Sequence, residues 1–246
     1  MQTVELNKNQ FKLDNEAISK QIGFDANHID ASNITLLAKN ILYTNDSTSA
    51  LITQLQLKEQ SGFMLDTLHA NVVYSSHQIS AKELFVKTPQ SLIQDNLEIL
   101  FDSLKTIQKY PQQSIVNIHL KESVISFDEV FLLMPSLSQN KNLLNWKHEK
   151  ISINTNVSGT LAELKIPALK VSTASATNIN AKALLTNITD VKKRSFDVNI
   201  LPSQFAKKDL AKFVTFSKEA YAKIPNFIAL NGSAKGSLND LMSKIK

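Results

Sequence analysis

The residues of this chain best suited to metal binding or acid–base chemistry are its histidines and its carboxylates. Histidines bind zinc when they recur at a spacing such as His-Glu-x-x-His, which sets two imidazoles on one face of a helix. No histidine of this chain has that spacing or a similar one, so each is expected to be an ordinary strand or loop residue. The five histidines are His28, His69, His77, His119 and His148.

The adjacent carboxylates Asp128 and Glu129 are a second candidate, but they follow Ser126 in the order of a helix capping box. In such a box the hydroxyl caps the first turn, and the carboxylate three residues later accepts a hydrogen bond from the backbone N–H of the cap residue. Negative charge at this end of a helix also suits the helix dipole. The chain also has no cysteine, no Gly-x-Ser-x-Gly elbow, no phosphate-binding loop and no dinucleotide fingerprint. We therefore expect a protein without catalytic residues, cofactors or metal sites.

The elements that would position a binding site are indicated by a two-residue alternation of apolar and other residues along nearly the whole chain. This alternation is typical of a half-buried strand and predicts a mainly β fold with one apolar face. In the segment 51–58, one parity is Leu51, Thr53, Leu55 and Leu57 and the other includes Gln54, Gln56 and Lys58.

The spacing of these segments favours an antiparallel meander. We expect strands near 4–6 and 10–13, a polar stretch at 15–27, and strands at about 33–43, 49–58, 63–74, 77–88 and 114–122. Further strands are expected around Ile151, Leu169 and Val198. Residues 92–108 fit both a helix and a strand, and periodicity does not decide between them.

Two helices are expected to interrupt the strands. The first begins at Ser126 and stops before Pro135, and the second runs from about Gln204 to Lys223 with an apolar stripe and several lysines elsewhere. Such an amphipathic helix packs on a sheet or covers an open end, and the alternative is that it binds a membrane surface.

The charge of the chain is uneven. Residues 1–123 have ten lysines and thirteen acidic residues, a net charge of −3, whereas residues 124–246 have seventeen basic and nine acidic residues, a net charge of +8. Arg194 is the only arginine, and nucleic-acid recognition favours arginine strongly. We therefore expect no nucleic-acid binding; the lysines suit exposed strand positions and edges, or a weak attraction to anionic headgroups.

No stretch approaches the ~18 apolar residues of a transmembrane helix, and the first residues lack the basic and apolar regions of an export signal. Two interpretations stay open. The chain is cytosolic, or it is a piece of a longer exported protein.

An internal repeat is indicated by segments that recur in the second half of the chain. The segment 159–164 (GTLAEL), which follows the first expected helix, resembles 236–241 (GSLNDL), which follows the second. Likewise the segment 84–88 (LFVKT) resembles 169–173 (LKVST), at nearly the same separation. Repeats of this kind stack on one another and extend the fold in one direction.

Several of these segments resemble successive strands of TamB-like translocation and assembly module proteins, which belong to the AsmA-type group of repeating β-groove, bridge-like lipid-transfer proteins. The resemblance covers most of residues 25–240, and its most specific part is Ser61-Gly62-Phe63 with the segment 87–91 (KTPQS). The other segments that carry it are 33–43, 55–63, 84–92 and 151–161.

The resemblance implies an elongated, curled and open antiparallel β-groove built from repeats, with units at about 25–135 and 136–225 and the next beginning at 226–246. It implies an interior fragment of a periplasmic protein, anchored in the inner membrane by a missing N-terminal part and reaching toward outer-membrane assembly machinery. The partners would be phospholipid acyl chains. The residues expected to line the groove are Leu36, Leu55, Leu57, Leu68, Val72, Leu84, Val86, Ile118, Ile153, Leu169, Val171 and Val198.

Two alternatives to a lipid groove remain at this point. In the first alternative, the chain is a periplasmic scaffold whose strand edges pair with outer-membrane β-strands during their assembly. Otherwise the apolar face closes on itself as the core of a β-sandwich with a structural role.

Overall fold

The structure is a computed structural model that describes residues 2–190, 192–237 and 241–245. Most of the described residues lie in strands, as the alternation predicts. The strands are β1 (Val4–Asp14), β2 (His28–Tyr43), β3 (Ser47–Glu59), β4 (Met64–Leu65), β5 (Thr67–Ser75), β6 (Gln78–Lys87), β7 (Leu92–Leu100), β8 (Ile115–Ser126), β9 (Lys150–Thr160), β10 (Glu163–Thr173), β11 (Asn178–Thr186), β12 (Ser195–Ala206), β13 (Phe227–Ser237) and β14 (Leu241–Ile245).

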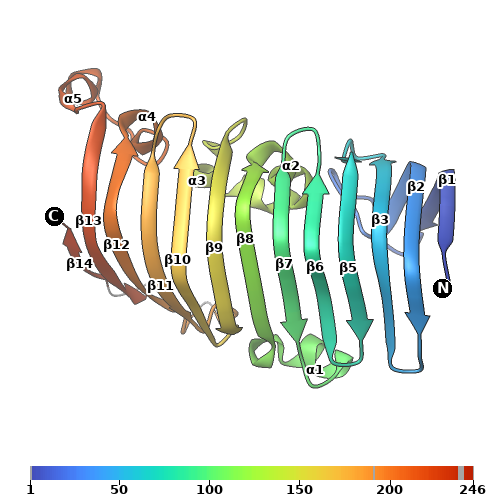
Figure 1. The fold of residues 1–246 in the computed structure, drawn as a ribbon. Helices are drawn as coiled ribbons and strands as arrows, with labels where there is room; N and C mark the ends of the chain where they lie inside the picture. The colour runs from blue at the N-terminus through green and yellow to red at the C-terminus, as the bar shows by residue number, and fades with distance from the viewer. Residues whose placement is uncertain (1, 191, 238–240, 246) are drawn as a thin grey trace. The chain divides into compact units, whose positions relative to one another are not determined.

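Short helices occupy some of the connections between strands (Figure 1). The described α-helices are α1 (Leu104–Lys109), α2 (Phe127–Leu133), α3 (Lys141–Leu144), α4 (Lys207–Leu210) and α5 (Lys218–Lys223), and two 3-10 turns cover Pro111–Gln113 and Pro135–Gln139. No helix in the described part of the chain is long and apolar enough to cross a membrane.

The strands form one open antiparallel sheet whose order follows the sequence, except that β4 pairs only with β3. Antiparallel neighbours need no crossover connection, so strands that follow one another in the chain can pair directly. The mainly β, open-sheet prediction is thereby confirmed. The sandwich alternative is wrong, because the described strands supply no second sheet to close over the apolar face.

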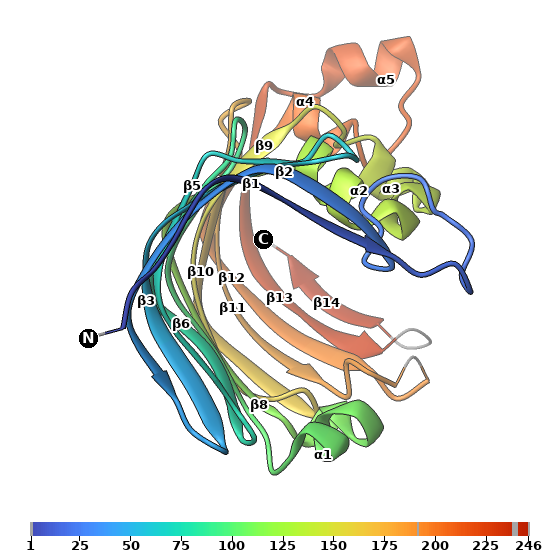
Figure 2. The same ribbon diagram turned by 90° about the vertical axis from the view of Figure 1, so that its right-hand side faces the viewer.

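The chain divides into two compact units. Unit 1 comprises residues 1–75, 80–95 and 123–150, and unit 2 comprises 76–79, 96–122 and 151–246. In each unit the strands bend along their length, so that its part of the sheet has a concave and a convex side (Figure 2).

Several sequence-based expectations need correction. The two short strands expected near the N-terminus are one strand, β1, and strands β11, β13 and β14 were not expected. Residues 92–108 contain both elements that their periodicity allowed, since β7 is followed by α1. The recurring segment 236–241 includes residues 238–240, which lie outside the described part of the chain.

The helix expected from Gln204 to Lys223 is wrong. Residues up to Ala206 still belong to β12, and α4 and α5 are separate helices of four and six residues. The strand pairing extends to Ala206, which pairs with Phe227 of β13, so the ladder takes the residues that a longer helix would need.

A bulge in β3 changes the face to which its residues point. Ala38 of β2 pairs with Ile52, whereas the preceding residue, Leu37, pairs with Gln54, so one residue of β3 is left over between them. An extra residue in one strand reverses the alternation beyond it. Leu51 therefore lies on the opposite face from Leu55 and Leu57, contrary to the simple alternation of the segment 51–58.

Candidate functional site

The apolar face of unit 1 is assembled by strand register. Ala38 of β2 pairs with Ile52 of β3, and Ile52 pairs with Ala70 of β5. Directly paired residues, and residues two apart on one strand, point to the same side of a sheet. Leu36 also pairs with Leu55. The expected lining residues that share this face are Leu36, Leu55, Leu57, Leu68 and Val72.

Leu84 and Val86 of β6 lie on the same side of the chain as Thr88, which contacts helix α2. Thr88, two residues after Val86, donates a hydrogen bond from its hydroxyl to Glu129 Oε2 of α2 at 2.7 Å. Leu84 is 6% exposed and belongs to the small core of unit 1.

Unit 2 has an apolar face built in the same way. Val171 of β10 pairs with both Ile153 of β9 and Ile179 of β11, so the three side chains lie in one row across the sheet. A neighbouring row contains Leu169, which pairs with Ala181 of β11, and Ala181 pairs with Ile200 of β12. The expected lining residues on this face are Ile153, Leu169, Val171 and Val198, the last lying two residues from Ile200.

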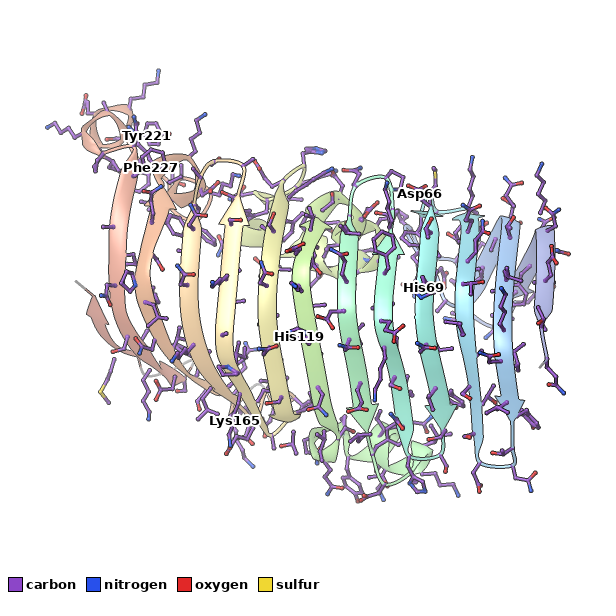
Figure 3. The ribbon with its side chains drawn as sticks, viewed as in Figure 1. Asp66, His69, His119, Lys165, Tyr221 and Phe227 are labelled. Atoms are coloured by element: carbon purple, nitrogen blue, oxygen red, sulfur yellow. The ribbon has the colours of Figure 1, made fainter. Side chains whose placement is uncertain are left out.

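Ile118 of β8 also belongs to unit 2. It alternates with His119, an exposed residue that points toward the viewer in Figure 3 together with Lys165 of β10. Lys165 alternates with Leu164, and Leu164 pairs with Leu185 of β11, which lies on the same side as the apolar rows. Lys165 and His119 therefore lie on the polar side. Ile118 points to the opposite, apolar side.

The two apolar faces are not sealed. Of the twelve expected lining residues only Leu84 is buried, and the other eleven are partly exposed. The fully buried hydrophobic residues of the described chain are few, and several are alanines. A closed β core buries its large side chains almost completely, so these rows of Leu, Ile and Val have the exposure of an uncovered surface.

The opposite side of the sheet in unit 2 carries a polar row. Glu98 of β7 accepts hydrogen bonds on its two carboxylate oxygens from the side-chain amides of Gln78 and Asn117, at 3.0 and 2.9 Å. Such a cross-strand row suits a face in contact with water. In unit 2 the sheet therefore separates an apolar side from a hydrated one.

A cavity of about 300 Å³ lies where the apolar face of unit 2 ends. It is lined by Leu185, Ile188 and Phe196 together with Arg194. Leu185 and Phe196 are directly paired residues of β11 and β12 on the apolar side. A guanidinium beside an apolar surface is suited to an amphipathic ligand with an anionic end.

A carboxylate holds the helical insertion against the sheet in unit 2. Asp209 of α4 is 0% exposed, and its Oδ2 accepts hydrogen bonds from the hydroxyls of Thr173 and Thr177, each at 2.6 Å. Its Oδ1 lies 3.2 Å from Lys212 Nζ. Thr177 also accepts a hydrogen bond from the backbone N–H of Ala206 at 2.9 Å.

Unit 1 contains the equivalent arrangement earlier in the chain. Glu129 of α2 accepts the hydroxyl of Thr88, and Ser91 Oγ accepts the backbone N–H of Ser126 at 3.0 Å. We call each set a carboxylate clasp: Thr88, Ser91, Ser126 and Glu129 in unit 1, and Thr173, Thr177, Ala206 and Asp209 in unit 2. The same arrangement thus occurs in both units.

The capping box predicted at Ser126 is not formed, although α2 begins where expected. The Ser126 side chain makes no cap hydrogen bond and instead donates to Gln90 Oε1 at 3.1 Å. Glu129 is held by Thr88 rather than by the helix start. Both side chains instead bind residues of the hairpin before β7, Gln90 and Thr88, so neither is left for the helix start.

Thr88 and Thr173 end the recurring segments 84–88 and 169–173, but no role was expected for these threonines or for Asp209. A signal was present. Glu129 and Asp209 are the third residues after Ser126 and Ala206, the last residues of strands that precede the two insertions.

The site best suited to acid–base chemistry is closed. His28 is 4% exposed, its Nδ1 lies 2.8 Å from Asp25 Oδ2, and its Nε2 lies 3.5 Å from Asp14 Oδ1. Both ring nitrogens thus lie next to carboxylates, and the imidazole itself is buried. Among the described residues, no cluster of three or more His, Asp or Glu side chains could hold a metal ion.

Three carboxylates have lowered pKa values. Backbone N–H donors from Gln21 and Asn27 lower the pKa of Asp25. Burial alone would raise the pKa of Asp209, but hydrogen bonds from Thr173, Thr177 and Lys212 outweigh it and leave the pKa below its usual 3.8. Burial likewise opposes a lowered pKa at Glu59, where donors from Ser61 and Asp30 prevail.

These lowered values predict acid sensitivity. A carboxylate with a depressed folded-state pKa stabilises the fold fully above its unfolded-state pKa, and that stabilisation is lost as the pH falls toward the folded-state value. We expect the free energy of unfolding to be steady near neutral pH and to fall below about pH 4. Urea unfolding across this range checks it, and a gain in stability on acidification would contradict the assignment of these groups.

No protein-family model, no curated protein and no solved structure matches this chain.

Proposed function

We propose that this chain is a non-enzymatic segment of an envelope-spanning β-groove that carries phospholipids between the inner and outer membranes. The observation that supports the proposal best is the pair of uncovered apolar faces. Rows of Leu, Ile and Val remain partly exposed on one side of the sheet in each unit, and in unit 2 the other side carries a row of hydrogen-bonded polar residues.

Acyl chains are the ligands that suit such a surface. A chain of about 16 carbons gains on the order of 12 kcal/mol when it leaves water, at about 0.8 kcal/mol per methylene. Aliphatic rows bind it at every position without polar specificity, and the headgroup stays in water at the open side. Arg194, beside the apolar cavity of unit 2, is placed to attract a phosphate.

The periplasmic location, the inner-membrane anchor outside this chain and the outer-membrane partner belong to the same proposal. They follow from the resemblance to TamB-like, AsmA-type proteins. A passive apolar surface of this kind needs neither a cofactor nor a catalytic residue.

Lipid crosslinking tests the proposal. With the chain exported to the periplasm, we expect a photoreactive amino acid at Leu169 to crosslink phospholipid, and Val171→Asp to reduce the yield at least tenfold, because a buried carboxylate costs several kcal/mol against an acyl chain. Native mass spectrometry of the same protein is expected to show retained phospholipid.

The matched control is Lys170→Asp, which adds the same carboxylate to the opposite face of β10. It is expected to leave the crosslink unchanged, and circular dichroism checks that both variants fold. Equal yields from the two variants, or no lipid with the parent protein, would exclude an acyl-chain site on this face.

One observation favours a scaffold for outer-membrane β-barrel assembly as the second candidate. Strand β1 lies at the end of the described strand order, and all but one of its eleven residues are exposed. An edge strand of this length can pair with a client strand through its backbone. A proline at Gln10 would weaken client pairing and leave lipid crosslinking at Leu169 unchanged, which separates the two functions.

A further inference from the structure

The segment 207–226, which joins β12 to β13 and contains α4 and α5, is the most basic connection in the described structure. It has five lysines and two acidic residues, a net charge of +3. Figure 1 shows both helices at the ends of these strands.

Some of these charges stabilise the segment itself. Asp209 is buried in the carboxylate clasp with Lys212 at its side. Lys207 donates a hydrogen bond to the carbonyl oxygen of Ile224 at 3.0 Å, and its Nζ lies 4.2 Å from the centre of the Tyr221 ring. These contacts stabilise the conformation of the segment. Its other lysines, Lys208, Lys218 and Lys223, are exposed to water.

The segment combines positive charge with exposed apolar side chains. Lys208, Lys218 and Lys223 are exposed, with Glu219 as the exposed acidic residue. Phe213 and Val214, in the loop between the two helices, are 50% and 47% exposed. Exposed lysines together with a half-exposed phenylalanine are the composition of a segment that inserts shallowly into a lipid interface.

The corresponding connection of unit 1 differs in charge. Residues 127–149 also expose apolar side chains, namely Leu133, Met134 and Leu144, but they contain two lysines and three acidic residues. Exposed apolar residues alone therefore do not distinguish the 207–226 segment, whereas its positive charge does.

We propose that the 207–226 segment binds the surface of a membrane that contains anionic phospholipid. Lys208, Lys218 and Lys223 attract the headgroups, and Phe213 and Val214 insert between them. Lysine suits this partner because its ammonium is a hydrated point charge that needs no fixed geometry, and each lysine near an anionic surface changes affinity about fivefold. The inference goes beyond lipid transfer and holds whether or not the apolar faces carry acyl chains.

Vesicle co-sedimentation of the whole chain tests the proposal. We expect binding to vesicles of phosphatidylcholine mixed with phosphatidylglycerol, much weaker binding to phosphatidylcholine alone, and loss of binding when the salt is raised from about 0.1 M to about 1 M. The variant K208Q/K218Q/K223Q is expected to bind about a hundredfold more weakly, and F213S/V214S at least tenfold more weakly.

Matched controls separate this surface from general effects. K8Q/K12Q/K39Q removes the same charge from β1 and β2, and L133S/M134S removes exposed apolar residues from the unit 1 connection; both are expected to bind like the parent chain. Val171→Asp is also expected to retain vesicle binding, which separates this result from acyl-chain uptake.

Three results would overturn the proposal: no binding to anionic vesicles, equal binding to both kinds of vesicle, or equal losses in K208Q/K218Q/K223Q and K8Q/K12Q/K39Q. Circular dichroism of each variant confirms that a loss of binding is not a loss of fold.

Discussion

Asp209→Ala is expected to lower the free energy of unfolding by about 3–5 kcal/mol, the range found when one partner of a buried charged pair is removed. The carboxylate is fully buried and accepts hydrogen bonds from two threonine hydroxyls while it faces Lys212. Alanine leaves all three donors without this acceptor in a site that water does not reach. Urea unfolding followed by circular dichroism measures the loss.

Two comparisons make this result specific. Asp197→Ala removes a carboxylate that pairs with Lys235 at an exposed position, and it is expected to cost at most about 1 kcal/mol. Glu129→Ala breaks the clasp of unit 1, where the acid is partly exposed, and is expected to cost about 1–2 kcal/mol. If Asp209→Ala cost no more than Asp197→Ala, the clasp would not stabilise the insertion.

Trp146→Ala is expected to cost about 3–5 kcal/mol, as large-to-small substitutions of buried aromatic residues do. Trp146 follows α3 and is buried, with its ring centre 5.8 Å from that of Phe127, which in turn lies 6.2 Å from Phe131 of α2. These three rings join the connection 127–149 into one small core of unit 1. Removing the indole leaves a cavity that the short helices have few neighbours to fill.

Tyr43→Ala is the matched control, because Tyr43 is a large aromatic residue that is mostly exposed at the end of β2. Its cost is expected to lie within about 0.5 kcal/mol. Circular dichroism serves for both variants, since Trp146 is the only tryptophan and its removal also removes that fluorescence signal. A cost below about 1 kcal/mol for Trp146→Ala would contradict the assignment of this core.

The two clasps and the aromatic core stabilise the helical connections 127–149 and 207–226. Their residues are not part of the apolar faces. The structure thus separates the residues that hold the insertions from the residues proposed to bind lipid. Loss of lipid binding in Val171→Asp can therefore be distinguished from loss of stability in Asp209→Ala.

Local sequence patterns gave the wrong element where hydrogen bonding between strands competes with them. The apolar stripe of 204–223 fits a helix, but pairing of Ala206 with Phe227 extends β12 through its first residues. The bulge between Ile52 and Gln54 depends on the register of β2 against β3, which no property of the segment 51–58 alone reveals. The capping box at Ser126 failed for a similar reason, since its two side chains bind residues 36 and 41 positions away.

The sequence by itself determined that the chain forms successive strands with one apolar side, because a period of two residues suits a strand and leaves little freedom in which side chains share a face. It also determined where two insertions interrupt the strands, although the second insertion contains two short helices and not the single helix expected. Only the tertiary structure decided that the apolar side stays uncovered, that bulges reset it, and that buried carboxylates tie the insertions to earlier hairpins. Those outcomes depend on contacts between residues far apart in the chain, and local periodicity carries no information about such contacts.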